Sequence, residues 1–250
     1  MKTIVLSAGH GGRDPGAVAN GLREKDFNLA VVLATRDYLN QNYEGHKLVL
    51  PRDSDVFVSL PDRRDLTREV DADLYVSCHA NSFNNPAANG FETFVHSGPL
   101  YDVTFDYREA IHSHIYKYLS TLSIRDRGMK RHDHWVTRNM PCPTVLVEYF
   151  FVSNPREAAF GKSAEHIKNM GIATAKGIAD ALGLPKVSKP PKPPEELPEI
   201  QRMIRVEIDG KMTNIPAYLI DGSTYIHGAP LVRALGYQIS GHGDHVQIGK

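Results

Sequence analysis

Short apolar runs alternate with amphipathic stretches over the first 184 residues of the chain. Apolar and β-branched runs bounded by turn residues predict strands at residues 3–8, 47–50, 74–81, 91–95 and 143–149. Apolar residues at helical spacing predict helices at residues 24–40, 60–70, 107–122 and 167–182. Residues 13–21, 125–140 and 150–154 are predicted as loops or turns, the second of them polar and basic. Such alternation is typical of an α/β domain.

The pattern changes after residue 184. Residues 185–198 contain six of the sixteen prolines, interspersed with lysine and glutamate, which predicts a semi-rigid extended linker. Beyond it we expect strands at 203–208, 213–220, 224–226 and 246–248, with Asp-Gly hairpin turns after the first two and a short helix at 230–235. The predicted domains are therefore 1–184, a linker at 185–199, and a small α+β domain at 200–250.

Composition narrows the classes of function. The formal net charge is zero, which favours neither nucleic acid nor an anionic membrane as a partner. No stretch approaches the ~20 apolar residues of a membrane span. Residues 3–8 resemble a first core strand rather than a leader, so we expect no signal peptide. Two cysteines exclude a disulfide framework and a cysteine-rich metal site, and we expect both in the core, with Cys78 facing away from His79.

Polar residues stand where predicted strands end. His79 follows the apolar run 74–78, and His10 lies in a glycine-rich turn after residues 3–8. The turn lacks the sequence of a phosphate-binding loop, so a nucleotide site is set aside. Glu148 lies in an apolar strand, where a carboxylate is costly unless a cation or a hydrogen-bond network meets it. Glu24 falls in the first turn of a predicted helix, whose dipole alone favours an acidic residue.

Other histidines carry weaker signals. His112 and His114 lie about 200° apart around a helix, so they cannot share a metal ion, and we expect both on the surface. His132 and His134 would share a face of an extended segment, which leaves a metal pair conceivable. Substrate contact or simple solvation fits that basic segment, which also holds Trp135, better than a metal site does.

Two imidazoles and one carboxylate form a ligand set for a hydrolytic zinc ion that keeps an open coordination position. A second carboxylate nearby can act as the general base. His10, Glu24, His79 and Glu148 supply these residue types. Their wide spacing matches no short zinc motif, so spacing alone is weak evidence.

The stretches around these four residues resemble the zinc-dependent N-acetylmuramoyl-L-alanine amidases of the amidase-3 type. The resemblance lies in residues 4–12, 23–28, 72–81 and 143–154, in the family's order, and includes Arg127-Gly128. It implies a three-layer α/β/α sandwich with a mixed, mainly parallel sheet. It also implies that His10, Glu24 and His79 ligate one Zn²⁺ and that Glu148 is the catalytic carboxylate. Phe150 stands where the family usually has glycine, which predicts an altered backbone beside Glu148.

The tail resembles the small stalk-like domain related to the amino-terminal domain of copper amine oxidases. The resemblance rests on residues 206–211, 215–226 and 235–237. It implies attachment to a cell-wall polymer, with homodimerisation as the alternative role, and it implies no copper ligands.

The leading hypothesis is a peptidoglycan hydrolase that cleaves the amide between N-acetylmuramic acid and L-alanine. With no leader expected, a phage endolysin held in the host cytoplasm until release fits best. One alternative is a zinc peptidase or carboxypeptidase acting on peptidoglycan stem peptides, which the masses of the products would distinguish. The other is a non-catalytic wall-binding protein, which the presence of all four functional residues argues against.

Overall fold

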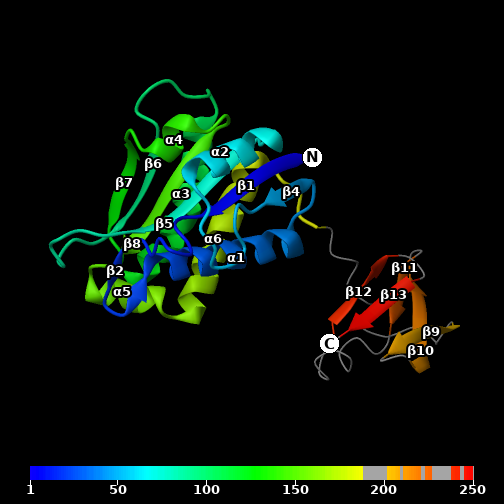
Figure 1. The fold of residues 1–250 in the computed structure, drawn as a ribbon. Coiled ribbons are helices and arrows are strands. Elements are labelled where there is room, and N and C mark those ends of the chain that lie inside the picture. Colours follow the sequence, from blue (N-terminus) through cyan, green and yellow to red (C-terminus); the bar gives the residue numbers. More distant parts are fainter. Residues whose placement is uncertain (188–201, 209–210, 221–222, 227–237, 243–244, 250) are drawn as a thin grey trace. The chain divides into compact units, whose positions relative to one another are not determined.

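The computed structural model describes residues 1–187 and, beyond them, only the strands within residues 202–208, 211–220, 223–226, 238–242 and 245–249 (Figure 1). The chain divides into two compact units, Met1–Val187 and Ser188–Lys250, and each is described by itself. No helix in the described ranges combines the length and apolarity needed to cross a bilayer.

The first unit alternates strands and helices as the sequence pattern predicts. Its strands are β1 (Lys2–Ala8), β2 (Val18–Ala19), β3 (Leu22–Arg23), β4 (His46–Val49), β5 (Leu74–Asn81), β6 (Phe91–Val95), β7 (Asp126–Arg131) and β8 (Thr144–Phe151). Its helices are α1 (Glu24–Asn42), α2 (Leu60–Glu69), α3 (Thr104–Leu119), the 3₁₀ turn η1 (Ser120–Leu122), α4 (Trp135–Asn139), α5 (Pro155–Gly161) and α6 (Ala164–Leu182).

Six of these strands form one sheet in the order β4-β1-β5-β8-β6-β7. Neighbouring strands are parallel except for the antiparallel pair β6 and β8. The mixed, mainly parallel sheet is therefore confirmed. Because of the one reversal, β6 and β7 begin at the edge where β1, β5 and β8 end.

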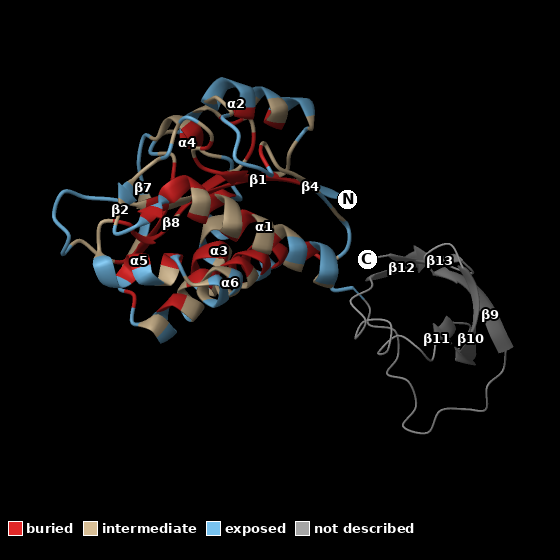
Figure 2. Cartoon of the chain, turned by 60° about the horizontal axis from the view of Figure 1, so that its bottom comes forward, coloured by how far each residue is buried: buried red, intermediate tan, exposed pale blue. Residues whose placement is uncertain are grey.

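Strand alternation divides the buried side chains between the two faces of the sheet. Ile4, Leu6, Leu74 and Val76 belong to the larger core, which α1, α3 and α6 cover. The opposite face has a smaller apolar cluster under α4, formed by Val5, Tyr75, Val136, Met140, Cys142 and Leu146. Figure 2 shows buried strands between the helical layer of α1, α3 and α6 and the smaller cover of α2 and α4. The expected three-layer α/β/α arrangement follows.

Local signals explain where α6 begins and ends. The Ser163 hydroxyl accepts a hydrogen bond from the His166 amide, which caps the helix. Gly183 ends it in the left-handed conformation, with φ 61°. Contacts of this unit extend beyond residue 184, because the Val187 amide donates to the carbonyl of Asn42.

The structure corrects three expectations for local elements. Residues 125–140 are not a loop, because they contain β7 and α4; β7 is an edge strand paired only with β6, so its polar composition hides its type. Residues 150–154 do not simply turn the chain, since β8 continues to Phe151 and α5 follows. The Asn154 side chain caps α5, and Pro155 occupies its first turn. The predicted loop at 13–21 contains the strand β2, which pairs with β3 in a short hairpin.

His112 is the histidine whose predicted place is wrong. It is buried, with Nδ1 2.9 Å from the Thr93 hydroxyl and Nε2 3.2 Å from Asp126. The helix α3 packs against both α6 and the strands, so its buried face is wider than a single apolar stripe. His114 is partly exposed and lies beside Asp180. Both cysteines are buried and free, and Cys78 lies in the core opposite to His79, as predicted.

In the second unit the structure describes two small antiparallel sheets. The first pairs β9 (Arg202–Ile208), β10 (Lys211–Ile220) and β11 (Ser223–Ile226), in agreement with the predicted hairpins. The second pairs β12 (Gln238–His242) with β13 (His245–Gly249), of which only β13 was expected. The linker, the Asp-Gly turns and the predicted helix at 230–235 lie outside the described residues. The predicted domain boundaries stay predictions.

Candidate metal centre and active-site groove

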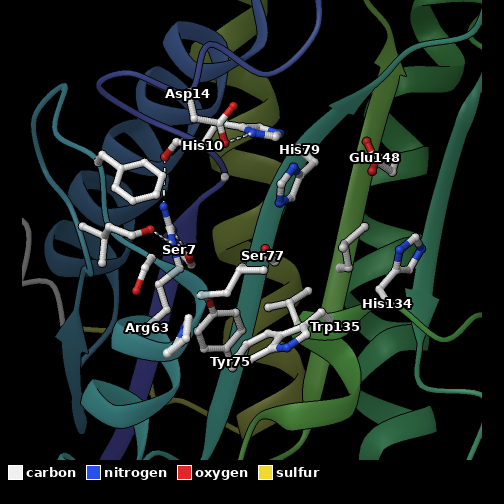
Figure 3. A pocket seen from close by; sticks show the side chains of 18 residues that line it. Ser7, His10, Asp14, Arg63, Tyr75, Ser77, His79, His134, Trp135 and Glu148 are labelled. Atoms are coloured by element: carbon white, nitrogen blue, oxygen red, sulfur yellow. Dashed lines mark hydrogen bonds and ion pairs between the residues drawn. The ribbon is translucent and has the colours of Figure 1, made fainter.

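Three of the four predicted site residues meet at the edge where β1 and β5 end. His10, Glu24 and His79 each offer one donor atom, and these atoms all lie within 4.8 Å of one another. Within the described part of the chain, no other set of three or more histidine, cysteine or carboxylate side chains has its donor atoms this close together. Figure 3 shows the rings of His10 and His79 turned toward each other, with Glu148 on the neighbouring strand.

His10 is held by an unusual backbone and by two buried arginines. Its φ of 58° lies in the left-handed region, which is strained for a residue other than glycine. Arg63 donates to the carbonyl of His10, and Arg52 donates to that of Gly9. Asp14 Oδ2 lies 2.7 Å from His10 Nδ1 and so orients the ring, leaving Nε2 toward Glu24. A carboxylate behind a histidine is a common second partner at metal sites.

Glu24 is the first residue of α1 and connects the two imidazoles. Its Oε2 lies 3.2 Å from His10 Nε2, and its Oε1 lies 2.9 Å from His79 Nδ1. The side chain of Asn28, one helical turn later, donates to Oε1. The amide of Ala17 donates to Oε2. The carboxylate is thus fixed from both sides before any ligand arrives.

The mutual contacts set the charges of this group. Burial opposes ionisation of Glu24, yet hydrogen bonds to His10 and His79 hold the pKa of its carboxyl well below the ordinary value. Burial also opposes the charge on His10, but Glu24 and Asp14 raise its pKa to about 9. The carboxylates of Glu24 and Asp14 thus surround the imidazole of His10 with negative charge, and a metal cation that displaces its proton would meet the same charge.

Two glycines leave room for the donors. A Cβ on Gly9 would lie 2.1 Å from Cε1 of His79, so the ring packs directly on the backbone there. Gly16 has φ +63°, and a Cβ there would lie 2.6 Å from Glu24 Oε2. The turn after β1 and the loop before α1 can approach the donors this closely because both positions lack a side chain.

Glu148 lies beside this group but outside it. Its Cα pairs with that of His79 across β5 and β8. Its Oε2 is buried and has no hydrogen-bond partner among the described residues. Burial, and then the charges of Glu24 and Glu92, raise the pKa of this carboxyl well above the ordinary value. A carboxylate of raised basicity next to a cation site is suited to accept and return a proton.

The strand β8 carries a bulge directly after Glu148. Ala80 alone separates the paired residues on β5, whereas Tyr149 and Phe150 separate those on β8. The bulge places both aromatic side chains in the helix-covered core, where Phe150 contacts Phe27 with ring centroids 4.6 Å apart. The backbone beside Glu148 is thus irregular, and Phe150 points away from the groove.

A cavity of about 610 Å³ adjoins His10, His79 and Glu148 (Figure 3). Its far side is lined by α2, by α4 and by the sheet face beneath them, with Trp135, Leu146 and Tyr75 among the lining residues. His134 also lines it, whereas His132 does not; their rings lie 4.3 Å apart. Because His134 and Trp135 line the cavity, they are placed to contact a bound molecule, which is one of the two roles favoured for this segment over a metal pair.

Sequence reasoning missed the residues that support the site. Asp14, Arg52 and Arg63 act on His10 only through the folded chain, and no local motif singles them out. Asn28 lies within the stretch 23–28 that carries the resemblance, four residues after Glu24. Its position one helical turn from Glu24 was the available signal.

The fold is an α/β domain, and its candidate centre has two histidines and one carboxylate at the carboxyl ends of the strands. This combination indicates the class of metal-dependent hydrolases. A family model described as N-acetylmuramoyl-L-alanine amidase matches residues 4–180. The chain belongs to this family.

Named relatives and a solved structure support the assignment. The chain is 39% identical over 196 residues to an endolysin of Bacillus phage SPP1, covering 78% of this chain and 71% of the relative. It is 36% identical over 191 residues to a sporulation-specific N-acetylmuramoyl-L-alanine amidase of Bacillus subtilis (strain 168), covering 75% and 71%. The catalytic domain of the amidase CwlV from Bacillus (Paenibacillus) polymyxa var. colistinus matches with TM-score 0.68 and 31% identity, covering 74% of this chain and 100% of that one.

Proposed function

We propose that the first unit hydrolyses the amide bond between the lactyl group of N-acetylmuramic acid and L-alanine in peptidoglycan. The observation that carries the proposal is the convergence of His10, Glu24 and His79 beside Glu148, in a chain of this amidase family. The substrate is a muramoyl peptide, and the products are a muramoyl carboxylate and a peptide with a free L-alanine amino group.

The donor set fits zinc. Two imidazole nitrogens and one carboxylate oxygen, with carboxylate and amide groups behind them, are ligands that zinc takes in hydrolases. His10, Glu24 and His79 would hold one Zn²⁺. A zinc ion there supplies Lewis acidity, polarising the scissile carbonyl and lowering the pKa of a water molecule.

Glu148 handles the proton in this proposal. Its carboxylate accepts a proton from the attacking water, whose oxygen bonds to the scissile carbonyl carbon. It then gives that proton to the amide nitrogen as the carbon–nitrogen bond breaks. The raised pKa of this carboxyl suits the first transfer, because a more basic carboxylate accepts a proton more readily.

Glu148→Gln tests this role, since the amide keeps the shape of the side chain but takes no proton. We expect hydrolysis to fall by about 10²–10⁴-fold with zinc content and thermal unfolding unchanged. The readout is mass spectrometry of soluble wall fragments. Glu165→Gln, on the exposed surface of α6, is the matched control and keeps full activity.

Persistence of hydrolysis in Glu148→Gln would contradict the assignment of the proton-transferring group. The same spectra separate the alternatives. Intact stem peptides with free muramoyl groups mean an amidase, whereas released amino acids mean a peptidase or carboxypeptidase. If the wild-type chain releases no products from any wall fragment, the non-catalytic wall-binding protein is the alternative that remains.

The tail would attach the enzyme to a cell-wall polymer, as its resemblance to a stalk-like domain implies. The proposed biological role is that of an endolysin, which resides in the host cytoplasm until release and then acts on the wall. The similarity to the phage SPP1 endolysin supports that role. Homodimerisation through the tail is the alternative role for residues 200–250. Sedimentation of the full chain distinguishes the two roles: sedimentation together with purified walls supports attachment, and sedimentation as a dimer without walls supports homodimerisation.

A further inference from the structure

A second charged cluster lies beside Glu148, on strands β6 and β7. Its centre is Glu92, which is 2% exposed. Glu92 Oε2 accepts hydrogen bonds from Arg127 Nε, at 2.9 Å, and from the Lys130 ammonium. Its Oε1 accepts from the Asn81 side chain at 2.7 Å. One buried carboxylate thus holds two cations, which leaves the cluster with an excess of one positive charge.

Both cations are fixed in place and still reach solvent. The side chains of Arg127 and Lys130 are 32% and 38% exposed. The Arg127 guanidinium lies 4.9 Å from the centre of the Phe151 ring, and Lys130 Nζ lies 5.9 Å from that of Phe94. Their positions are therefore defined on the protein side, while further donors remain for another partner.

The cluster lies in line with the candidate centre. Glu92 pairs with Glu148 across β6 and β8, and Glu148 pairs with His79 across β8 and β5. Adjacent strands lie ~5 Å apart, so the row His79, Glu148, Glu92 leads from the metal donors to the cations in two short steps. The row exists because β6 runs antiparallel and begins at this edge.

We propose that Lys130 and Arg127 bind a carboxylate of the stem peptide, with Glu92 as the residue that positions both cations. This subsite rests on the proposed function. Glu148 returns its proton to the L-alanine nitrogen, so the peptide leaves from the Glu148 side of the site. Two extended residues span about 7 Å, which brings the carboxylate of the residue after L-alanine within reach of the cluster.

The two buried arginines next to the centre, Arg52 and Arg63, are not available for this task. Arg52 donates to the carbonyls of Ala8, Gly9, Lys25 and Ser54. Arg63, which lines the cavity, is buried and donates to the Ser7 hydroxyl and to the carbonyls of Val58, Ala8 and His10. These two buried guanidiniums are engaged with the protein, whereas the cations on the β6–β7 side are accessible to a charged group of the substrate. The cavity beneath α4, with its apolar and aromatic lining, takes the remainder of the muramoyl peptide.

The test compares two soluble peptidoglycan fragments that differ only at the residue after L-alanine. One carries D-glutamate with its free carboxylate, and the other carries the carboxamide, D-isoglutamine. We expect the zinc-loaded full chain to prefer the carboxylate by about five- to tenfold in kcat/KM, because a charge-assisted hydrogen bond is lost in the amide. The ratio of the two rates does not depend on how much of a preparation is folded.

Lys130→Met is expected to reduce this preference to near unity by raising KM for the carboxylate fragment, and Lys130→Arg to keep it. Glu92→Gln, which frees both cations, is expected to weaken the preference without abolishing turnover of the carboxamide. Lys2→Met is the matched control and keeps the preference, since Lys2 is 45% exposed and bound to one carboxylate, Asp73, at the opposite end of β1.

Two results would overturn the subsite. One is a wild-type chain with equal kcat/KM for both fragments. The other is a Lys130→Met variant that keeps the wild-type preference. A wild-type chain that releases a free L-alanine amino group from neither fragment nor from whole walls refutes the proposed function instead, so the two failures are distinguishable.

Discussion

Replacing Gly9 with alanine adds one methyl group at the point where the backbone supports His79. The added Cβ would lie 2.1 Å from Cε1 and 2.5 Å from both ring nitrogens of His79. The backbone at Gly9 needs no left-handed conformation, since Gly9 is absent from the positive-φ glycines. The clash with the imidazole is therefore the main consequence of the substitution.

The size of the effect follows from these distances. Ordinary van der Waals contact begins at 3.4 Å, so the ring must withdraw by 3.4 − 2.1 = 1.3 Å or the turn must move. Metal–ligand distances tolerate only about 0.2 Å. We expect zinc affinity to fall by about 10–100-fold, the range seen when a supporting residue is altered. Overpacking should also cost about 1–3 kcal/mol of unfolding free energy.

Competition titration with a chromogenic chelator measures the zinc affinity, and thermal unfolding with and without zinc measures the stability. Gly98→Ala is the control, because a Cβ there would lie 2.4 Å from Nε2 of His96, which is not part of the metal group. The control is expected to lose stability without losing zinc affinity. Wild-type zinc affinity in Gly9→Ala would refute the reasoning that His79 binds the metal in this orientation.

Two further predictions concern stability and wall binding. Burial lowers the pKa of His112 against the opposing charge of Asp126, so between that pKa and 6.5 the unfolded chain binds more protons than the folded one. Folding stability should therefore fall as pH drops below 6.5. In His112→Gln, the denaturant midpoint should depend less on pH between about pH 7 and 5 than in the wild-type chain. An unchanged pH dependence would exclude His112 as the cause. A chain ending at Val187 keeps the hydrogen bonds of its last residues to Asn42 and Glu44, at the end of α1. It is expected to hydrolyse soluble fragments but to sediment less with purified walls. Equal sedimentation of both chains would contradict wall attachment by the tail.

Periodicity predicts elements well where one face alone is buried. The sequence predicts the helix α1 to within two residues, because its apolar positions face one core. The strand β5 is buried on both faces, and its apolar run and the turn residues beside it, rather than a periodicity, predict its bounds. Periodicity fails where an element is buried on two sides or exposed at an edge. Thus the sequence predicts a surface position for His112 and a loop at residues 125–140, where the structure has a buried side chain and the strand β7.

The candidate ligands could be found from sequence because His10 and His79 follow apolar strands and Glu24 begins a helix. Glu92 could not be found in that way. Its closeness to Glu148 depends on the antiparallel pairing of β6 with β8, which no short-range pattern encodes. For the same reason the partnership of Glu92 with Arg127 and Lys130 appears only in the folded chain.

The unequal covering of the sheet has a consequence for access. The helices α1, α3 and α6 cover one face, whereas α2 and α4 form the smaller cover of the other (Figure 2). The cavity beside the centre lies on that second face. A cross-linked polymer has no free end to thread into a closed chamber. In the proposed function, a site that is open at one side would accept such a mesh lying sideways across the row His79, Glu148, Glu92, and hydrolysis would not need a free chain end.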